Sequence, residues 1–229
     1  MYADLTTQNR AWLKRFSHHA RFEKALDLLD PKPGESILDF GTGDGYMLKR
    51  LILREPECQV IGYEPTQYRL KEFAAAEGER KIQLLGDISG LTERFDKVVC
   101  LEVLEHLTVA NQRQALREML RLLKPTGSLI ISVPIEVGLS SLLKNITRLI
   151  LGQGHGNTNF KTFIFSALGI HFDRGDAAYI PSHMGFYYHD LDSLFSEFDL
   201  RIVEKNFSPF PLLRGLLNSQ VFFSLGRGS

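Results

Sequence analysis

Short apolar runs alternate with amphipathic segments along most of this chain. The apolar runs have the length expected of buried strands and lie at 36–40, 59–63, 82–86, 95–101 and 128–133. Apolar residues at helical spacing predict helices at 8–29, 44–54, 66–77 and 108–123. A last helix is expected over 188–198, before strands at 200–207 and 219–225. This alternation is typical of an α/β fold with a largely parallel sheet.

The turn after the first strand is rich in glycine. Residues 37–45 read Ile-Leu-Asp-Phe-Gly-Thr-Gly-Asp-Gly, which predicts a buried strand, a tight turn and the start of a helix. Glycines at alternate positions leave out the β-carbons, so a ligand can lie against the backbone there.

Polar residues also follow the next strands. Glu64 ends the second apolar run, Asp87 ends the third, and the sequence Glu-Val-Leu-Glu-His at 102–106 follows the fourth. Open α/β sheets bind ligands at the carboxyl ends of their strands. The sequence therefore predicts one ligand site at this edge.

In their order, these motifs resemble those of class I S-adenosylmethionine-dependent methyltransferases of the small, single-domain type. The resemblance is firm over 35–134 and looser from 183 onward. It implies an α/β fold with a Rossmann-like, doubly wound sheet of about seven strands. That sheet would be mostly parallel with an antiparallel last strand, and a helical insertion would follow strand five. It divides one methyltransferase domain, 1–229, into a leading helix (1–34), a cofactor-binding half (35–134), a helical cover insertion (135–182), and a C-terminal helix and strands (183–229).

The resemblance assigns S-adenosyl-L-methionine as the cofactor and gives the matched residues roles. Glu64 would accept both ribose hydroxyls, since charge-assisted hydrogen bonds of this type are strong. Asp87 would accept from the adenine amine, with the Ile88 N–H offered to a ring nitrogen, and Asp39 would face the methionine ammonium. The implied cofactor site also contains Phe40, Gly41, Thr42, Gly43, Gly45, Pro65, Leu101 and Glu102.

A nicotinamide dinucleotide site is the alternative for the same strand, turn and helix. That fingerprint spaces its last two glycines as Gly-x-x-Gly and places a pyrophosphate at the helix N-terminus. Here the spacing is Gly43-Asp44-Gly45, and Asp44 would put a negative charge beside the phosphates. The dinucleotide reading also gives Asp39 and Asp87 no task, so the methyltransferase reading is favoured.

Composition limits the partners. Lysine plus arginine and aspartate plus glutamate both number 27, so the formal net charge is zero and we expect no nucleic-acid partner. Cys58 and Cys100 both fall inside predicted strands, which predicts buried thiols, no disulfide framework and no metal site. No apolar run has the length of a membrane span and no signal core begins the chain, so a cytoplasmic location is expected.

Residues 135–182 depart from the resemblance. From Val137 to Phe172 there is no acidic residue, and leucines and isoleucines recur at helical spacing over 139–151. We expect a helical cover over a small-molecule acceptor, which could be apolar or lipid-linked. A homodimer face, an extension of the core or a surface resting on a membrane would produce the same pattern.

Methyl transfer to a hydroxyl or amine needs a group that receives a proton. His106 and His183 are the candidate catalytic residues, because histidine titrates near neutral pH and both are expected near the pocket. The predicted reaction moves a methyl group to an oxygen of a saccharide, lipid-linked or secondary-metabolite substrate. The alternative is a non-catalytic relative that binds S-adenosylmethionine as a regulatory or partner protein.

Overall fold

The structure of the 229-residue chain is a computed structural model. It describes residues 19–66, 82–136, 170, 180, 185–210 and 218–228. The helix expected at 66–77, most of the insertion and His183 lie outside these residues.

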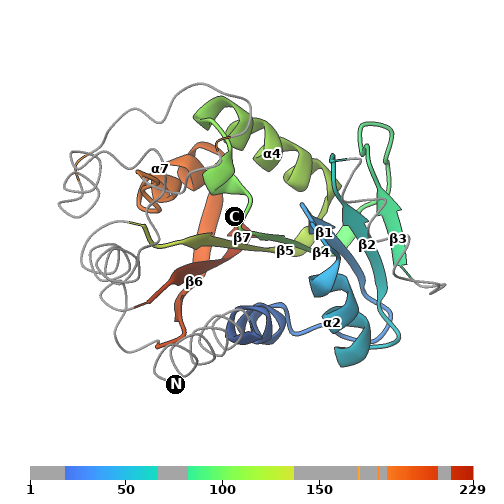
Figure 1. The fold of residues 1–229 in the computed structure, drawn as a ribbon. Coiled ribbons are helices and arrows are strands. Elements are labelled where there is room, and N and C mark those ends of the chain that lie inside the picture. Colours follow the sequence, from blue (N-terminus) through green and yellow to red (C-terminus); the bar gives the residue numbers. More distant parts are fainter. Residues whose placement is uncertain are drawn as a thin grey trace, which may run out of the picture.

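One sheet organises the described part of the chain (Figure 1). Its strands are β1 (Ser36–Phe40), β2 (Gln59–Tyr63), β3 (Ile82–Leu85), β4 (Phe95–Leu101), β5 (Leu123–Pro134), β6 (Leu200–Ser208) and β7 (Gln220–Arg227). They lie in the order β3-β2-β1-β4-β5-β7-β6. Strands β1 to β5 pair in parallel, whereas β7 runs antiparallel to both of its neighbours. The predicted Rossmann-like sheet, including its antiparallel last strand, is confirmed.

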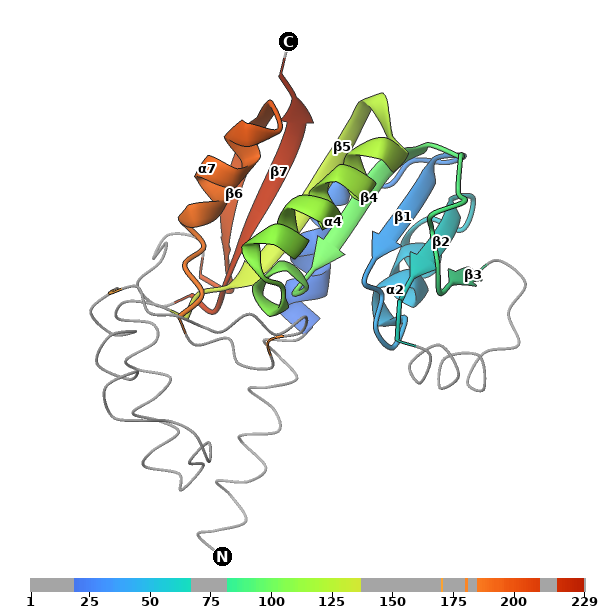
Figure 2. The ribbon, with the colours of Figure 1, turned by 90° about the horizontal axis from the view of Figure 1, so that it is seen from above.

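Helices cover both faces of this sheet. The helix at 19–29 and α2 (Tyr46–Arg54) lie on one face, and α4 (Val109–Leu122) and α7 (Asp190–Glu197) lie on the other (Figures 1 and 2). Successive side chains along each strand point to opposite faces of the sheet. Ile131 packs beneath α4 and α7, and Ile130 packs on the other face. Each fully buried leucine or phenylalanine contributes roughly 1.5–3 kcal/mol to stability.

Local signals explain where α2 and α4 begin. The Thr108 hydroxyl accepts from the Asn111 N–H and caps α4. Helix α2 starts at Tyr46, two residues later than expected, because Gly45 holds a left-handed φ of 72°.

Strand β5 is longer than predicted. It begins at Leu123, directly after α4, and Leu123 pairs with Phe95 at the start of β4. The expectation of a start at residue 128 was wrong because Gly127 was interpreted as following the end of the preceding helix. Instead the chain passes straight into the sheet.

Strand β6, at one edge of the sheet, is irregular. Its register against β7 shifts between Ile202 and Glu204, which is a β-bulge centred on Val203, and the Val203 side chain is 61% exposed. In the part of the chain that is described, no helix has both the length and the apolar character needed to cross a bilayer.

Candidate functional site

The glycine-rich loop after β1 is fixed to the end of β2. Gly41 and Gly43 have left-handed φ values of 83° and 59°. The N–H groups of Gly41 and Thr42 both donate to the Tyr63 carbonyl, at 2.8 and 2.9 Å. The loop therefore keeps its open shape through backbone contacts.

Glu64 ties this loop to the next one. Its carboxylate is 4% exposed and accepts from the Gly43 N–H at 3.0 Å through Oε2 and from the Thr66 N–H at 2.9 Å through Oε1. The Glu64 N–H donates to the Leu85 carbonyl of β3. Glu64 thus orders the glycine loop at the ligand-binding edge of the sheet.

Asp39 is a buried acid at the end of β1. It is 2% exposed, and its Oδ2 accepts from the Thr42 hydroxyl at 2.6 Å. Burial raises the pKa of Asp39 to about 7, the Thr42 hydrogen bond opposes this rise, and the charges of Asp44 and Glu64 add to it. No cation among the described residues lowers this pKa. The position therefore suits a cationic ligand group.

The turn after β4 packs against the glycine loop. A β-carbon built on Gly41 would lie 2.5 Å from Cγ2 of Val103, so only glycine permits this approach. Val103 leads into the short 3₁₀ helix η1 (Leu104–His106). The loops after β1 and β4 therefore meet where the strand order reverses, which is where such sheets bind ligands.

Gly41→Ala is expected to destabilise the protein by about 2–5 kcal/mol. The left-handed backbone costs an alanine about 1–2 kcal/mol, and overpacking against the stiff Val103 side chain adds about 1–3 kcal/mol. Gly34→Ala is the matched control, because Gly34 has a φ of 78° with nothing within 4 Å of its built β-carbon. Urea denaturation should show the larger loss for Gly41→Ala. Equal losses in the two variants would mean that the Val103 contact does not matter.

Leu101 and Glu102 close the end of β4. Glu102 has a left-handed φ of 57°, and its N–H donates to the Ser132 carbonyl of β5 at 3.0 Å. The Ser132 hydroxyl donates to Oε1 of Glu102 at 3.1 Å, and Nη1 of Arg21 lies 3.5 Å from Oε2.

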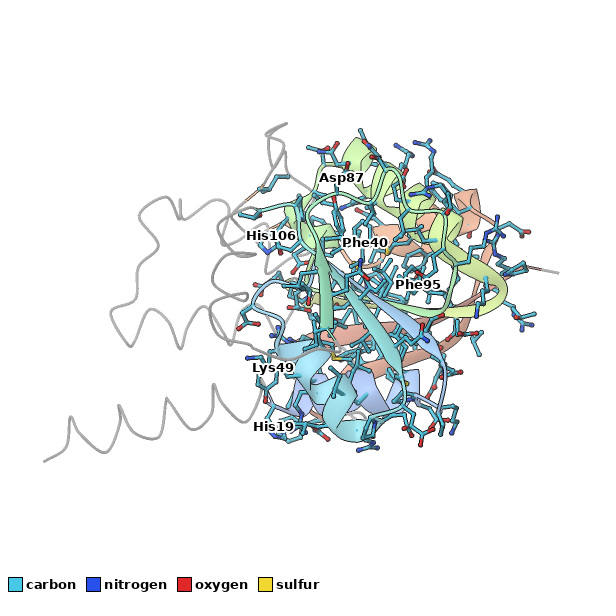
Figure 3. All side chains as sticks on the ribbon, turned by 90° about the vertical axis from the view of Figure 1, so that its right-hand side faces the viewer. His19, Phe40, Lys49, Asp87, Phe95 and His106 are labelled. Atoms are coloured by element: carbon cyan, nitrogen blue, oxygen red, sulfur yellow. The ribbon has the colours of Figure 1, made fainter. Side chains whose placement is uncertain are left out.

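His106 is half-buried at the end of η1. Its Nδ1 lies 2.8 Å from the Ile180 carbonyl, which can only accept, so Nδ1 carries the proton. The Ile180 N–H in turn donates to the His106 carbonyl. In the neutral ring, Nε2 then holds the lone pair, 3.8 Å from Oε1 of the fully buried Glu105. Figure 3 shows His106 at the opposite end of the sheet from Phe95, the first residue of β4.

The remaining predicted site residues differ in exposure. Asp87 is exposed, and its carboxylate accepts from the N–H and hydroxyl of Ser89, which lowers its pKa. Ile88 is buried, and Pro65 is exposed. Phe40 packs in the core against the Tyr63 ring at a centroid distance of 4.9 Å, so only its backbone can face a ligand.

The structure brings Asp39, the glycine loop, Glu64 and Glu102 to one edge of the sheet. Sequence reasoning did not identify Tyr63, Ser132 or Arg21. Ser132 carried a signal, since it is a polar residue within an apolar strand, but Arg21 lies in a helix and carried none.

A seven-stranded sheet of this order, with a glycine loop after β1 and acids after β1 and β2, defines the class I methyltransferase fold. Comparison with known families gives the same result. A family model described as "Methyltransferase domain" matches residues 8–205, and the chain belongs to this family.

Curated relatives match part of the chain. An uncharacterized methyltransferase of Geobacillus kaustophilus is 31% identical over 114 residues, which is 48% of this chain and 52% of that protein. A ubiquinone biosynthesis O-methyltransferase of Alkalilimnicola ehrlichii is 31% identical over 117 residues, covering 49% and 47%. The chain spans about half the length of these curated relatives.

Solved structures resemble most of the chain. A cyclopropane synthase of Mycobacterium tuberculosis has a TM-score of 0.61 at 15% identity, over 91% of this chain and 83% of that one. The N-methyltransferase NodS of Bradyrhizobium japonicum, in complex with S-adenosyl-L-homocysteine, has a TM-score of 0.59 at 15% identity, over 92% and 87%. At these identities the likeness shows the fold alone.

Proposed function

We propose that this protein is an S-adenosyl-L-methionine-dependent methyltransferase that acts on an oxygen of a small molecule. The observation that carries the proposal is the pairing of a buried acid, Asp39, with a glycine loop held open by Glu64. A cofactor with an ammonium group, a ribose diol and no phosphate fits this donor and acceptor set.

Each end of the cofactor has a candidate partner. Asp39 would receive the ammonium, because a cation relieves the cost of ionising a buried carboxylate. Glu64 would accept from the ribose hydroxyls. Asp87 and the Ile88 N–H would contact adenine, and the Gly41 and Gly43 backbone would lie against the amino-acid end.

When bound, S-adenosylmethionine supplies an electrophilic methyl group, which forms a bond to the acceptor oxygen as the S–CH₃ bond pair passes to sulfur. The chain must align the acceptor and receive the proton of its hydroxyl. His106 suits the second task, because the Ile180 carbonyl fixes the tautomer that leaves Nε2 unprotonated. The neighbouring Glu105 would stabilise the imidazolium. His183 remains a second candidate from the sequence.

The oxygen acceptor draws support from the relative named as a ubiquinone biosynthesis O-methyltransferase. The proposal places the reaction in the cytoplasm, where the methyl donor is found. A saccharide, a lipid-linked compound or a secondary metabolite is the proposed acceptor class.

A methyl-transfer assay tests the function. The purified protein is incubated with methyl-labelled S-adenosylmethionine and either catechol, methyl glucoside or a small-molecule cell extract. We expect S-adenosylhomocysteine to form and one compound to gain a labelled methyl group. Tight cofactor binding without any transfer would instead support a non-catalytic binding protein.

His106→Asn is expected to keep cofactor binding and to lower transfer by roughly a hundredfold or more, the usual contribution of a general base. Asparagine can still donate to the Ile180 carbonyl but cannot accept a proton at neutral pH. His189→Asn is the control, since His189 is exposed beside Tyr188. Unchanged transfer in His106→Asn would assign the proton to another group.

A further inference from the structure

The connection between β3 and β4 crosses the sheet without a helix. Residues 86–94 run from the carboxyl end of β3 to the amino end of β4, and β2 and β1 lie between those two strands. A crossover between parallel strands usually carries a helix, which would bond its own backbone groups. Here the chain instead forms a turn, in which the Leu91 N–H donates to the Ile88 carbonyl at 3.1 Å. The carbonyls of this turn are therefore open to donors from other elements.

Arg121 of α4 donates to both ends of the turn. Its Nη2 donates to the Ile88 carbonyl at 2.8 Å, and its Nη1 donates to the Leu91 carbonyl. One carboxylate oxygen of Glu118, three residues earlier on α4, accepts from Nε at 2.9 Å and from Nη2 at 2.7 Å. A guanidinium is planar and holds its donors in a fixed fork. Arg121 therefore fixes the two carbonyls relative to each other and to α4.

The turn begins at the residues proposed to contact adenine. Asp87 is exposed, and its carboxylate accepts from the Ser89 N–H and hydroxyl, both at 2.8 Å. Ile88 is 4% exposed and packs in the core cluster that includes residues of α4. Figure 3 shows Asp87 on the opposite side of the sheet from His19 and Lys49. The Arg121 contact thus holds the chain one residue away from the acid that would meet the base.

A held turn matters because adenine recognition needs two groups at a fixed separation. Adenine presents a donor amine at C6 and an acceptor nitrogen at N1, which match a carboxylate and a backbone N–H. Hypoxanthine presents a carbonyl and an N–H at the same two positions, so neither pair forms. Ordering a flexible segment on binding consumes part of the binding free energy, and a segment ordered beforehand avoids that loss. The loss falls on adenine, because adenine is the base that uses the ordered turn.

We propose that Arg121 is a positioning residue for the adenine end of the cofactor. Its bridge to the carbonyls of Ile88 and Leu91 sets the preference of the site for adenine over hypoxanthine. This inference rests on the proposed function, since it takes Asp87 and the Ile88 N–H as the contacts of the base.

The experiment compares Arg121→Met, Arg121→Lys and Glu118→Gln with the wild type. Arg113→Met is the matched control, because Arg113 lies on the same helix but pairs with Glu197 of α7, with Nε and Oε2 2.7 Å apart. The probes are S-adenosylhomocysteine and S-inosylhomocysteine, which differ in the base alone. Calorimetry measures both affinities, hydrogen exchange measures the protection of residues 86–94, and thermal unfolding measures stability.

Arg121→Met is expected to lower the affinity for S-adenosylhomocysteine by roughly tenfold or more. The affinity for S-inosylhomocysteine should change by less than about threefold, because hypoxanthine forms no pair with the ordered turn. Amides of 86–94 should exchange faster in this variant. Arg121→Lys should restore part of the adenine preference, since an ammonium keeps the charge but not the fork. Glu118→Gln should cause a smaller loss, and Arg113→Met should leave both affinities unchanged.

An equal loss of affinity for the two ligands in Arg121→Met would make Arg121 a general stabilising residue and overturn the inference. Should Arg121→Met fail to fold, a wild-type ratio of the two affinities in both Arg121→Lys and Glu118→Gln would overturn it as well. A wild-type protein that bound neither ligand would contradict the proposed function and this inference together. Wild-type binding of S-adenosylhomocysteine with an unchanged ratio in every variant would refute the role of Arg121 alone.

Discussion

Glu64→Ala is expected to weaken S-adenosylmethionine binding by roughly 10- to 150-fold, or about 1.5–3 kcal/mol. The variant loses the proposed charge-assisted bonds to the ribose diol. It also removes the acceptor for the Gly43 N–H and the Thr66 N–H, so the glycine loop should be less ordered before the ligand arrives. Calorimetry at neutral pH measures the change.

Two further variants separate these effects. Glu64→Gln keeps the size of the side chain. Its amide NH₂, however, would lie opposite a backbone N–H that donates to a carboxylate oxygen in the wild type. It should therefore lose affinity too. Glu93→Ala removes an exposed acid near the start of β4 and should bind like the wild type. If both Glu64 variants bound S-adenosylmethionine with wild-type affinity, the assignment of Glu64 to the ribose would be wrong.

Cofactor affinity is expected to fall as the pH drops below about 7, approaching about tenfold per pH unit. The reason is the pKa of Asp39, which is raised from 3.8 to about 7 in the cofactor-free protein. An ammonium ligand binds the ionised form, so binding must release the proton that Asp39 holds at lower pH. Calorimetry in two buffers of different ionisation enthalpy counts this proton.

The raised pKa of Asp39 has the opposite effect on the stability of the cofactor-free protein, which should fall as the pH rises. A raised pKa in the folded state gives stability that is fully present below 3.8 and is lost as the pH rises through about 7. Asp39→Asn should therefore gain stability over the wild type as the pH rises, while its cofactor affinity becomes lower and independent of pH.

Two controls test the cause of the pH dependence. S-Adenosylhomocysteine carries the same ammonium without the sulfonium charge and should show the same slope. Asp44→Asn removes a charge that raises the pKa of Asp39, so the inflection should move to lower pH. An affinity that is flat from about pH 5.5 to 7.5 would contradict the role of Asp39, whose expected slope lies in this range.

The sequence predicted most of this fold because its signals are local. Strands β2 and β4 have the predicted bounds, and Thr108 caps α4, since apolar runs and capping residues act over a few positions. The start of β5 could not be read in this way. Leu123 is extended because it pairs with Phe95, and that tertiary contact overrides the local preference of Pro125 and Gly127.

In the candidate site, too, local sequence signals predicted some features and tertiary contacts determine the others. Asp39 and Glu64 follow strands in the sequence and could be placed at one edge by the topology. The bond from Gly43 to Glu64 and the ion pair of Arg21 with Glu102 join residues from separate elements. No periodicity encodes such contacts, so the approach of Arg21 to Glu102 becomes visible only when the helix at 19–29 is packed on the sheet.

The bulge at Val203 has a consequence for self-association. An edge strand can recruit a second chain when its backbone groups form a regular ladder, as in amyloid and in many sheet-extended dimers. The register shift between Ile202 and Glu204 interrupts that ladder within β6 and increases its local twist. Two copies therefore cannot pair in one continuous backbone ladder along the full length of β6.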